Sequence, residues 1–209
     1  MKRFFDIFVS ILGLIILSPL FIAVSVAIKL EDKGPVFYRA NRVGLNKNMF
    51  RMFKFRTMVV NADKSGPSSA SISDPRITRI GKFLRKNKMD EMPQLINVLT
   101  GEMSLVGPRP EEKKFTDLFS EAESVILTVK PGITDWASIW NSDEAFLLEG
   151  SADPDKTYME AIRPTKIQLQ IYYVNNSSFF IDLKILFLTF AKLLFNINLN
   201  LESKIKTII

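Results

Sequence analysis

Two adjacent carboxylates, Asp90 and Glu91, are the strongest candidates for chemistry in this chain of 209 residues. They lie between a basic segment and Pro93, and proline favours the first turn of a helix. A carboxylate can act as a nucleophile, and a neighbouring carboxylate can hold Mg²⁺ against substrate phosphates. The free N–H groups at a helix start also suit a phosphate. The alternative is that both residues only cap a helix.

Two cationic residues are candidate phosphate contacts. Arg109 lies between two prolines in residues 107–110, a stretch that cannot form a helix interior and predicts a stiff turn. A guanidinium fixed on such a turn can bind a phosphate through two hydrogen bonds. Lys54 lies between Phe53 and Phe55 on a predicted strand. The alternatives are an ordinary turn with an exposed Arg109, and a Lys54 that protects the edge of a strand.

The composition restricts the chemistry further. The chain contains no Cys and no His, which excludes disulfides, thiolate metal sites, Ser-His triads and His proton shuttles. Any catalysis must therefore use carboxylates, Lys, Arg, hydroxyls or a bound hard cation. The formal net charge of +6 favours an anionic partner, which could be a nucleic acid, an anionic lipid or a phosphorylated substrate. A basic soluble protein without such a partner is the alternative.

The N-terminal part of the chain predicts a membrane segment. Residues 7–28 contain no charge, and as a helix these 22 residues would extend about 33 Å, enough to cross the apolar core of a bilayer. A signal peptide starts in a similar way, but this apolar run is long and no clear small-x-small cleavage site follows it. We therefore expect the segment to be retained.

The path of this segment through the bilayer has two interpretations. Ser18 and Pro19 lie in its middle, and proline removes one helical hydrogen bond, so we expect a kink there. Lys2 and Arg3 precede the segment, and residues 29–56 carry eight Lys or Arg against two acids. Because positive charge marks the cytoplasmic side, both flanks favour a hairpin that enters and leaves on one face. A spanning helix stays open as the alternative, since proline is also common in such helices.

The remainder of the chain predicts a helix-rich α+β fold. Residues 35–58 favour two strands around a turn at 44–48. Residues 76–88 favour a basic amphipathic helix, which suits either a membrane surface or phosphates, or packs on a core with its basic face in solvent. The other expected elements are a mobile loop at 64–75, a helix from Pro93 to Gly101, a helix at 111–129, a loop at 132–156, a helix at 160–176, and an interfacial or core-packed apolar helix at 179–195.

The carboxylate pair belongs to a longer pattern. The sequence MDEMPQLINVLTGEMSLVGPRP at 89–110 strongly resembles the bacterial sugar transferase family of monotopic polyprenyl-phosphate phosphoglycosyl transferases. Further segments match in the expected order: KRFFD followed by the central Ser18-Pro19, PVFYRANRVG, FKFRTM, DPRITRIGKFLR, and KPGIT at 130–134. The resemblance covers nearly the whole chain, which looks like the minimal catalytic form of the family.

This resemblance implies a covalent mechanism. Asp90 would attack the sugar-linked phosphorus of a UDP-sugar and release UMP. Polyprenyl phosphate would then attack the phosphosugar–aspartyl intermediate, while Glu91 would coordinate Mg²⁺. The implied phosphate or nucleotide contacts are Lys54, Arg85, Pro108, Arg109 and Pro110.

The resemblance also implies a location and a set of partners. Ser18 and Pro19 would form a re-entrant break, so that residues 1–30 anchor the chain and residues 31–209 form a compact catalytic domain, with amphipathic interfacial helices, on the cytoplasmic face of the bacterial inner membrane. The expected partners are a UDP-sugar, polyprenyl phosphate and the lipid bilayer, and a homodimer is left open. The product would start the assembly of a cell-envelope glycan or glycoprotein.

The chain departs from the family pattern at two places. Many relatives have PGITG followed by a WAQVNGR-like stretch, whereas this chain has Asp135 and a different stretch up to Trp140. Many relatives also carry an Asp two residues before a Tyr-Tyr pair, where this chain has Gln170. If that Asp orders the active site in relatives, Gln170 must do so differently or not at all.

Two other functions compete with this interpretation. A non-catalytic membrane-surface scaffold would explain the apolar segment and the basic helix, but not the dense pattern at 89–110. Nucleic-acid binding is suggested by the net charge, but the sequence shows no zinc-ligand, RNP-like or helix-turn-helix pattern. We therefore expect no nucleic-acid partner.

Overall fold

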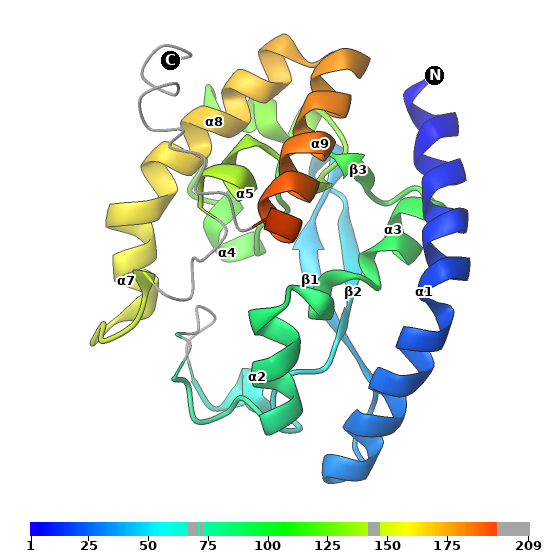
Figure 1. The fold of residues 1–209 in the computed structure, drawn as a ribbon. Helices are drawn as coiled ribbons and strands as arrows, with labels where there is room; N and C mark the ends of the chain where they lie inside the picture. Colours follow the sequence, from blue (N-terminus) through cyan, green and yellow to red (C-terminus); the bar gives the residue numbers. More distant parts are fainter. Residues whose placement is uncertain (67–70, 72, 142–146, 196–209) are drawn as a thin grey trace.

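The computed structural model describes residues 1–66, 71, 73–141 and 147–195, and its fold is helix-rich α+β, as predicted (Figure 1). The longer elements are α1 (Lys2–Asp32), β1 (Phe37–Val43), β2 (Met49–Phe55), α2 (Arg79–Lys86), α3 (Gln94–Thr100), β3 (Ser104–Val106), β4 (Gly132–Thr134), α8 (Arg163–Asn176) and α9 (Phe179–Phe195). The short helical segments are η1 (Leu45–Lys47), η2 (Ala62–Lys64), η3 (Met89–Glu91), α4 (Lys113–Thr116), η4 (Glu123–Thr128), α5 (Trp136–Trp140), α7 (Pro154–Thr157) and the π-helical η5 (Tyr158–Ile162).

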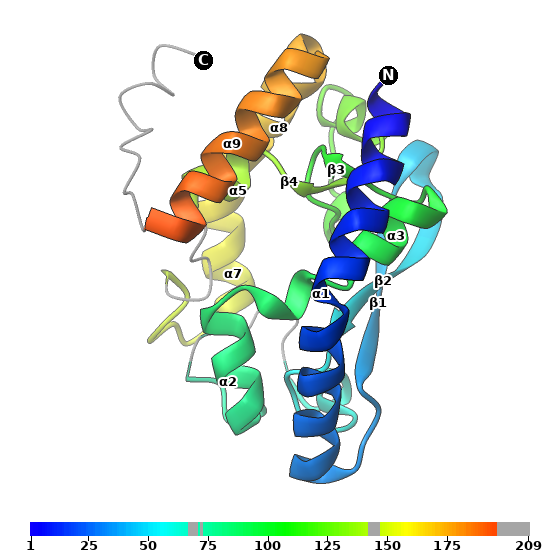
Figure 2. The same ribbon diagram turned by 45° about the vertical axis from the view of Figure 1, so that its right-hand side comes forward.

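The long apolar helix α1 runs along one side of the molecule (Figure 1, Figure 2). By length and composition it could cross a membrane. Large apolar side chains such as Phe4, Phe8 and Ile15 are exposed along it. Exposed apolar side chains gathered along one helix mark a site of interaction.

Pro19 lies inside α1 rather than between two separate helices. Because proline has no N–H, the carbonyl of Ile15 loses its helical donor. The hydroxyl of Ser18 donates to that carbonyl instead, at 2.8 Å. The helix therefore continues through the proline and bends about halfway along (Figure 1). The structure does not confirm the expected helix-break-helix, and the re-entrant path stays a prediction.

The start of α1 is tied to the globular part of the chain. Lys2 Nζ forms an ion pair with Asp182 of α9 at 2.5 Å and donates to the carbonyl of Val106 at 2.9 Å. Arg3 donates to the last carbonyls of α3, those of Val98 at 2.5 Å and Leu99 at 2.9 Å. Positive charge at the C-terminal end of a helix also complements its dipole.

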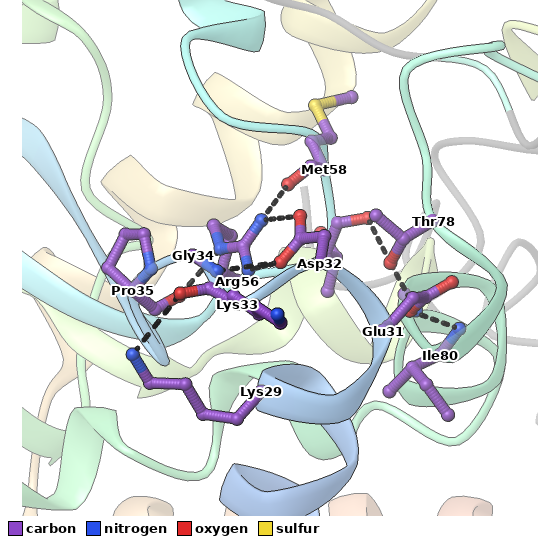
Figure 3. Close-up of polar contacts among 12 residues, drawn as sticks. Lys29, Glu31, Asp32, Lys33, Gly34, Pro35, Arg56, Met58, Thr78 and Ile80 are labelled. Atoms are coloured by element: carbon purple, nitrogen blue, oxygen red, sulfur yellow. Dashed lines mark hydrogen bonds and ion pairs between the residues drawn. The ribbon is translucent and has the colours of Figure 1, made fainter.

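The end of α1 is tied to the same body (Figure 3). The carboxylate of Glu31 accepts hydrogen bonds from the backbone N–H groups of Arg79 at 2.7 Å and Ile80 at 3.1 Å, and so caps α2. Asp32 forms an ion pair through both carboxylate oxygens with Arg56, just after β2. Both ends of α1 are therefore bound to the globular part of the chain, by residues that lie between positions 56 and 182.

The antiparallel hairpin of β1 and β2 confirms the two predicted strands, and its register places Tyr38 opposite Lys54. A fully buried side chain of α3, Asn97, holds the hairpin from one side. Its Oδ1 accepts from the backbone N–H of Phe53 at 2.8 Å, and its Nδ2 donates to the carbonyl of Arg51 at 3.0 Å. These bonds fix the part of β2 that carries Lys54.

A short parallel pair, β3 and β4, was missed by the sequence analysis. Two glycines allow the close approach after β3, because a Cβ on Gly132 would lie 2.1 Å from the backbone nitrogen of Gly107. The N–H of Gly107 donates to Thr134 and that of Gly132 to Pro108, both at 3.0 Å. The turn that follows β3 is thereby pinned against β4.

The predicted helix at 111–129 is wrong, because the chain forms the short α4 and then η4. The reason is a capping box within the predicted helix. The carboxylate of Glu123 accepts from the N–H of Ser120 at 2.8 Å, and the Ser120 hydroxyl accepts from the N–H of Glu123 at 3.3 Å. This reciprocal pair starts a new helical segment.

Other element boundaries agree with the prediction in part. The basic helix expected at 76–88 begins only at Arg79, because the Thr78 hydroxyl caps it by accepting from the N–H of Gly81 at 2.9 Å. The helix at 179–195 is confirmed as α9. The loop expected at 132–156 is wrong in part, since it contains β4, α5 and α7. Positions 67–70 and 72 of the predicted mobile loop lie outside the described residues.

Candidate active site

Glu91 joins three distant segments of the chain. Its Oε1 forms an ion pair with Lys54 Nζ of β2 at 2.7 Å. Arg109, in the turn after β3, donates to both oxygens of the same carboxylate, to Oε2 at 2.9 Å. Bidentate pairs of this kind fix geometry as well as charge. The structure therefore brings together three of the residues predicted from sequence.

Asp90 precedes Glu91 in the single turn η3, which follows Lys88 in a left-handed backbone conformation. Of the two carboxylates, Glu91 is the one that pairs with cations of the described residues. Asp90 is 8% exposed, and no residue in the described ranges donates a hydrogen bond to its carboxylate. An unbonded carboxylate keeps its lone pairs available for attack on an electrophile.

Arg85 supplies a third cation near Asp90, from the helix α2. Its Nε donates to the hydroxyl of Thr57 at 2.9 Å, which orients the guanidinium. Burial lowers the pKa of Arg85 and outweighs the nearby charge of Asp90, which acts to raise it. Thr57 was not singled out from sequence; its place within the FKFRTM motif was the one signal that could have found it.

The environments of the two carboxylates push their pKa values apart. Burial raises the pKa of Asp90, and the adjacent charge of Glu91 raises it further. Burial also acts to raise the pKa of Glu91, but the charges and hydrogen bonds of Arg109 and Lys54 outweigh it and hold that pKa well below its usual range. Neighbouring groups with opposite shifts are typical of functional sites.

A cavity of about 1810 Å³ opens beside the pair. Its polar part is lined by the site residues Lys54, Arg85, Asp90, Glu91, Arg109 and Pro110. Its apolar part is lined by Phe5, Val9, Gly13 and Leu17 of α1, with Leu186, Phe190 and Leu193 of α9. One cavity can therefore take a charged ligand and an apolar chain together.

Not every predicted residue lies in this site. Pro108 holds the turn but does not line the large cavity. Ser18 and Pro19 lie in α1, where they affect the course of the helix and not Asp90 or Glu91. The role predicted for them concerns membrane topology, which the structure leaves as a prediction.

Comparison with known proteins now identifies the kind of chain. The bacterial sugar transferase family matches residues 1–196. A UDP-N-acetylgalactosamine-undecaprenyl-phosphate N-acetylgalactosaminephosphotransferase of Aeromonas hydrophila is 39% identical over 196 residues, covering 92% of this chain and 43% of that protein. The UDP-glucose:undecaprenyl-phosphate glucose-1-phosphate transferase of Escherichia coli is 36% identical over 197 residues, covering 92% of this chain and 40% of that protein.

A shorter relative is covered over most of its length. The exopolysaccharide production protein ExoY of Sinorhizobium fredii is 37% identical over 203 residues, which cover 90% of this chain and 83% of ExoY. The chain thus belongs to the bacterial sugar transferase family, a family of phosphoglycosyl transferases. It spans about two fifths of the length of the Aeromonas and Escherichia relatives.

The ion pairs of Glu91 predict a pH-dependent contribution to stability. We expect Glu91→Gln to lower the free energy of unfolding by about 2 kcal/mol at pH 7, because two cations lose their common partner. The folded pKa of Glu91 is depressed, so its stabilisation is present above the ordinary value of 4.5 and is lost as the pH falls through the folded pKa. Denaturant titrations of the wild type and of Glu91→Gln in detergent, from pH 7 to pH 3, measure the difference in their free energies of unfolding.

The matched control for this experiment is Glu160→Gln, which removes an exposed pair with Lys156 at 4.0 Å. It should change the free energy of unfolding by less than about 0.5 kcal/mol. A Glu91→Gln protein as stable as wild type at every pH would contradict the proposed importance of the ion pairs.

Proposed function

We propose that this chain transfers a sugar 1-phosphate from a UDP-sugar to polyprenyl phosphate, with release of UMP, through a covalent intermediate on Asp90. The observation that carries the proposal is the placement of Asp90: a buried carboxylate that receives no hydrogen bond from the described part of the chain, beside three cations, in a cavity with an apolar wall. The names of the relatives support the undecaprenyl phosphate acceptor. The identity of the sugar is left open.

In the first step a carboxylate oxygen of Asp90 attacks the phosphorus next to the sugar. The bond from this phosphorus to the oxygen that bridges it to UMP breaks, and UMP leaves with that electron pair. Lys54, Arg85 and Arg109 offset the charge of the diphosphate, which lets an anionic nucleophile approach an anionic donor.

In the second step a phosphate oxygen of the polyprenyl phosphate attacks the same phosphorus. The bond to Asp90 breaks, the carboxylate is regenerated, and a polyprenyl-diphosphate sugar forms. The acceptor oxygen is already anionic, so no base has to remove a proton. This agrees with a chain that contains neither His nor Cys.

Asp90 and Glu91 are suitable ligands for Mg²⁺, and the phosphates of the substrate would complete the coordination. Mg²⁺ is usually bound by one or two carboxylates together with substrate phosphates and water. Glu91 Oε2 accepts one hydrogen bond, from Arg109, and keeps a lone pair, and Asp90 provides a second carboxylate. The described residues contain no group of three or more His, Cys, Asp or Glu that could hold a metal without substrate. When bound, the ion would neutralise part of the diphosphate charge.

The proposed anchor is one-sided, with the site at the cytoplasmic face of the bacterial inner membrane. Both ends of α1 contact the same folded unit, through Lys2 and Arg3 at the start and Glu31 and Asp32 at the end. A spanning helix would place its ends on opposite faces of the bilayer. Pro19 lies inside α1, and the helix bends about halfway along (Figure 1), which supports a helix that dips into one leaflet and returns.

The catalytic role of Asp90 predicts the effect of one substitution. Asp90→Asn should lower the rate of UMP release at least about 1,000-fold, because an amide oxygen is a poor nucleophile towards phosphorus. The assay uses purified protein in detergent with undecaprenyl phosphate, Mg²⁺ and a panel of UDP-sugars. Asp117→Asn, which alters an exposed pair with Lys113, is the matched control and should keep the wild-type rate. Undiminished release by Asp90→Asn would remove Asp90 as the nucleophile.

The topology predicts where each end of α1 can be labelled. The chain has no cysteine, so a cysteine inserted after Met1, or the separate variant Lys33→Cys, gives one reactive site. We expect a membrane-impermeant maleimide to label both variants only in inside-out membrane vesicles. Labelling of the two variants on opposite faces would show that α1 spans the bilayer.

A further inference from the structure

Asp135 is a fully buried carboxylate at the start of α5. Its Oδ1 accepts from the N–H and the hydroxyl of Ser138, both at 2.7 Å. Its Oδ2 accepts from the backbone N–H of Arg109 at 3.1 Å and from Gln170 Nε2 at 3.2 Å. All of these donors are neutral groups. A neutral Asn or Ser could also cap α5, so capping alone does not explain a buried charge at this position.

Gln170 reaches the same place from α8 and is also fully buried. Its Nε2 donates to Asp135 and, at 3.3 Å, to the carbonyl of Arg109. An amide at position 170 therefore complements a carboxylate at position 135. A second carboxylate at 170 would instead face the first across about the same distance, with no donor between them. Asp135 and Gln170 thus form one matched contact between α5 and α8.

The shared target of both side chains is the backbone of Arg109. Asp135 holds its N–H and Gln170 holds its carbonyl. Because Pro108 and Pro110 have no N–H, this is the single backbone donor among residues 108–110. The prolines restrict the backbone dihedrals, and the two hydrogen bonds set the position of the turn against α5 and α8. The guanidinium that pairs with Glu91 projects from this fixed backbone.

We propose that Asp135 and Gln170 are a matched pair of positioning residues that hold Arg109 for its contact with the phosphates of the donor. Asp135 and Gln170 contact the backbone of Arg109 and do not bond to Asp90 or Glu91, so they act through Arg109. The assignment of a phosphate contact rests on the proposed function, whereas the hold on the Arg109 backbone can be tested without any substrate.

The first test measures hydrogen exchange of the Arg109 amide by mass spectrometry or NMR, in full-length protein in detergent. Residues 108–110 contain one exchangeable backbone N–H, so the signal is unambiguous. Asp135→Asn should exchange this hydrogen at least about tenfold faster than wild type, because the charged acceptor is replaced by a weaker one. Asp153→Asn, which alters the corresponding cap of α7, is the control. An unchanged rate in Asp135→Asn would overturn the proposal.

The second test is a double-mutant cycle on UMP release. Asp135→Asn should lower kcat/KM for the UDP-sugar about tenfold in wild type and by less than about twofold in the Arg109→Ala background, since its effect passes through Arg109. If Asp135 only supports the fold, the two losses will multiply, and the proposal fails. A wild-type protein that releases no UMP would contradict the proposed function instead. The hydrogen-exchange measurement would then still decide whether Asp135 and Gln170 hold Arg109.

A further variant tests the match between the two positions. Gln170→Glu places two carboxylates in contact and should lower kcat/KM and thermal stability. Adding Asp135→Asn places an amide donor opposite the new carboxylate, so the double variant should be more thermally stable than Gln170→Glu alone. It should not regain activity, because neither new side chain can hold the Arg109 backbone as Asp135 and Gln170 do. A double variant that is less stable than Gln170→Glu would contradict the matched pair.

Discussion

The ion pairs of Glu91 are the constraint on which the rest of the site depends. A strand, a turn between two helices and a proline-bounded turn approach one another because each contributes a charge to the same cluster. Holding two cations on one carboxylate is stable only if the segments that carry them are fixed. Asn97 fixes β2, and the contact of Gly107 with Gly132 fixes the turn after β3. These contacts of the fold therefore hold Lys54 and Arg109 in position around Glu91.

The same cluster explains how a buried Asp90 can be reactive. Burial disfavours its ionised form, but Lys54, Arg85 and Arg109 favour it, and together they leave an excess of positive charge around a carboxylate that they do not bond. A diphosphate entering the cavity would find that charge already in place. The apolar wall from α1 and α9 adjoins it, as a reaction between a water-soluble donor and a lipid acceptor requires.

Sequence reasoning found the parts of the structure that local patterns encode. The hairpin and the apolar helices followed from residue patterns and turn residues. Lys54, Glu91 and Arg109 were named as candidate site residues from their motifs and the family resemblance, but the ion pairs among them were not predicted. The parallel pair β3–β4 was missed because its strands have three residues each and its register depends on two glycines meeting across 25 positions of sequence. The helix expected at 111–129 was wrong because Ser120 and Glu123 form a capping box within it, which starts a new helical segment. The contact between Asp135 and Gln170 joins α5 to α8 and could not be read from either segment alone.

The most direct test of the account is the mass of the intact protein after incubation with the UDP-sugar and Mg²⁺ in the absence of polyprenyl phosphate. The account predicts a mass increase equal to one sugar phosphate, located on the peptide that contains Asp90 and removed when the lipid acceptor is added. UMP release that requires both substrates, with no such adduct at any time in a rapid-quench series, would show direct transfer and would contradict the covalent role of Asp90.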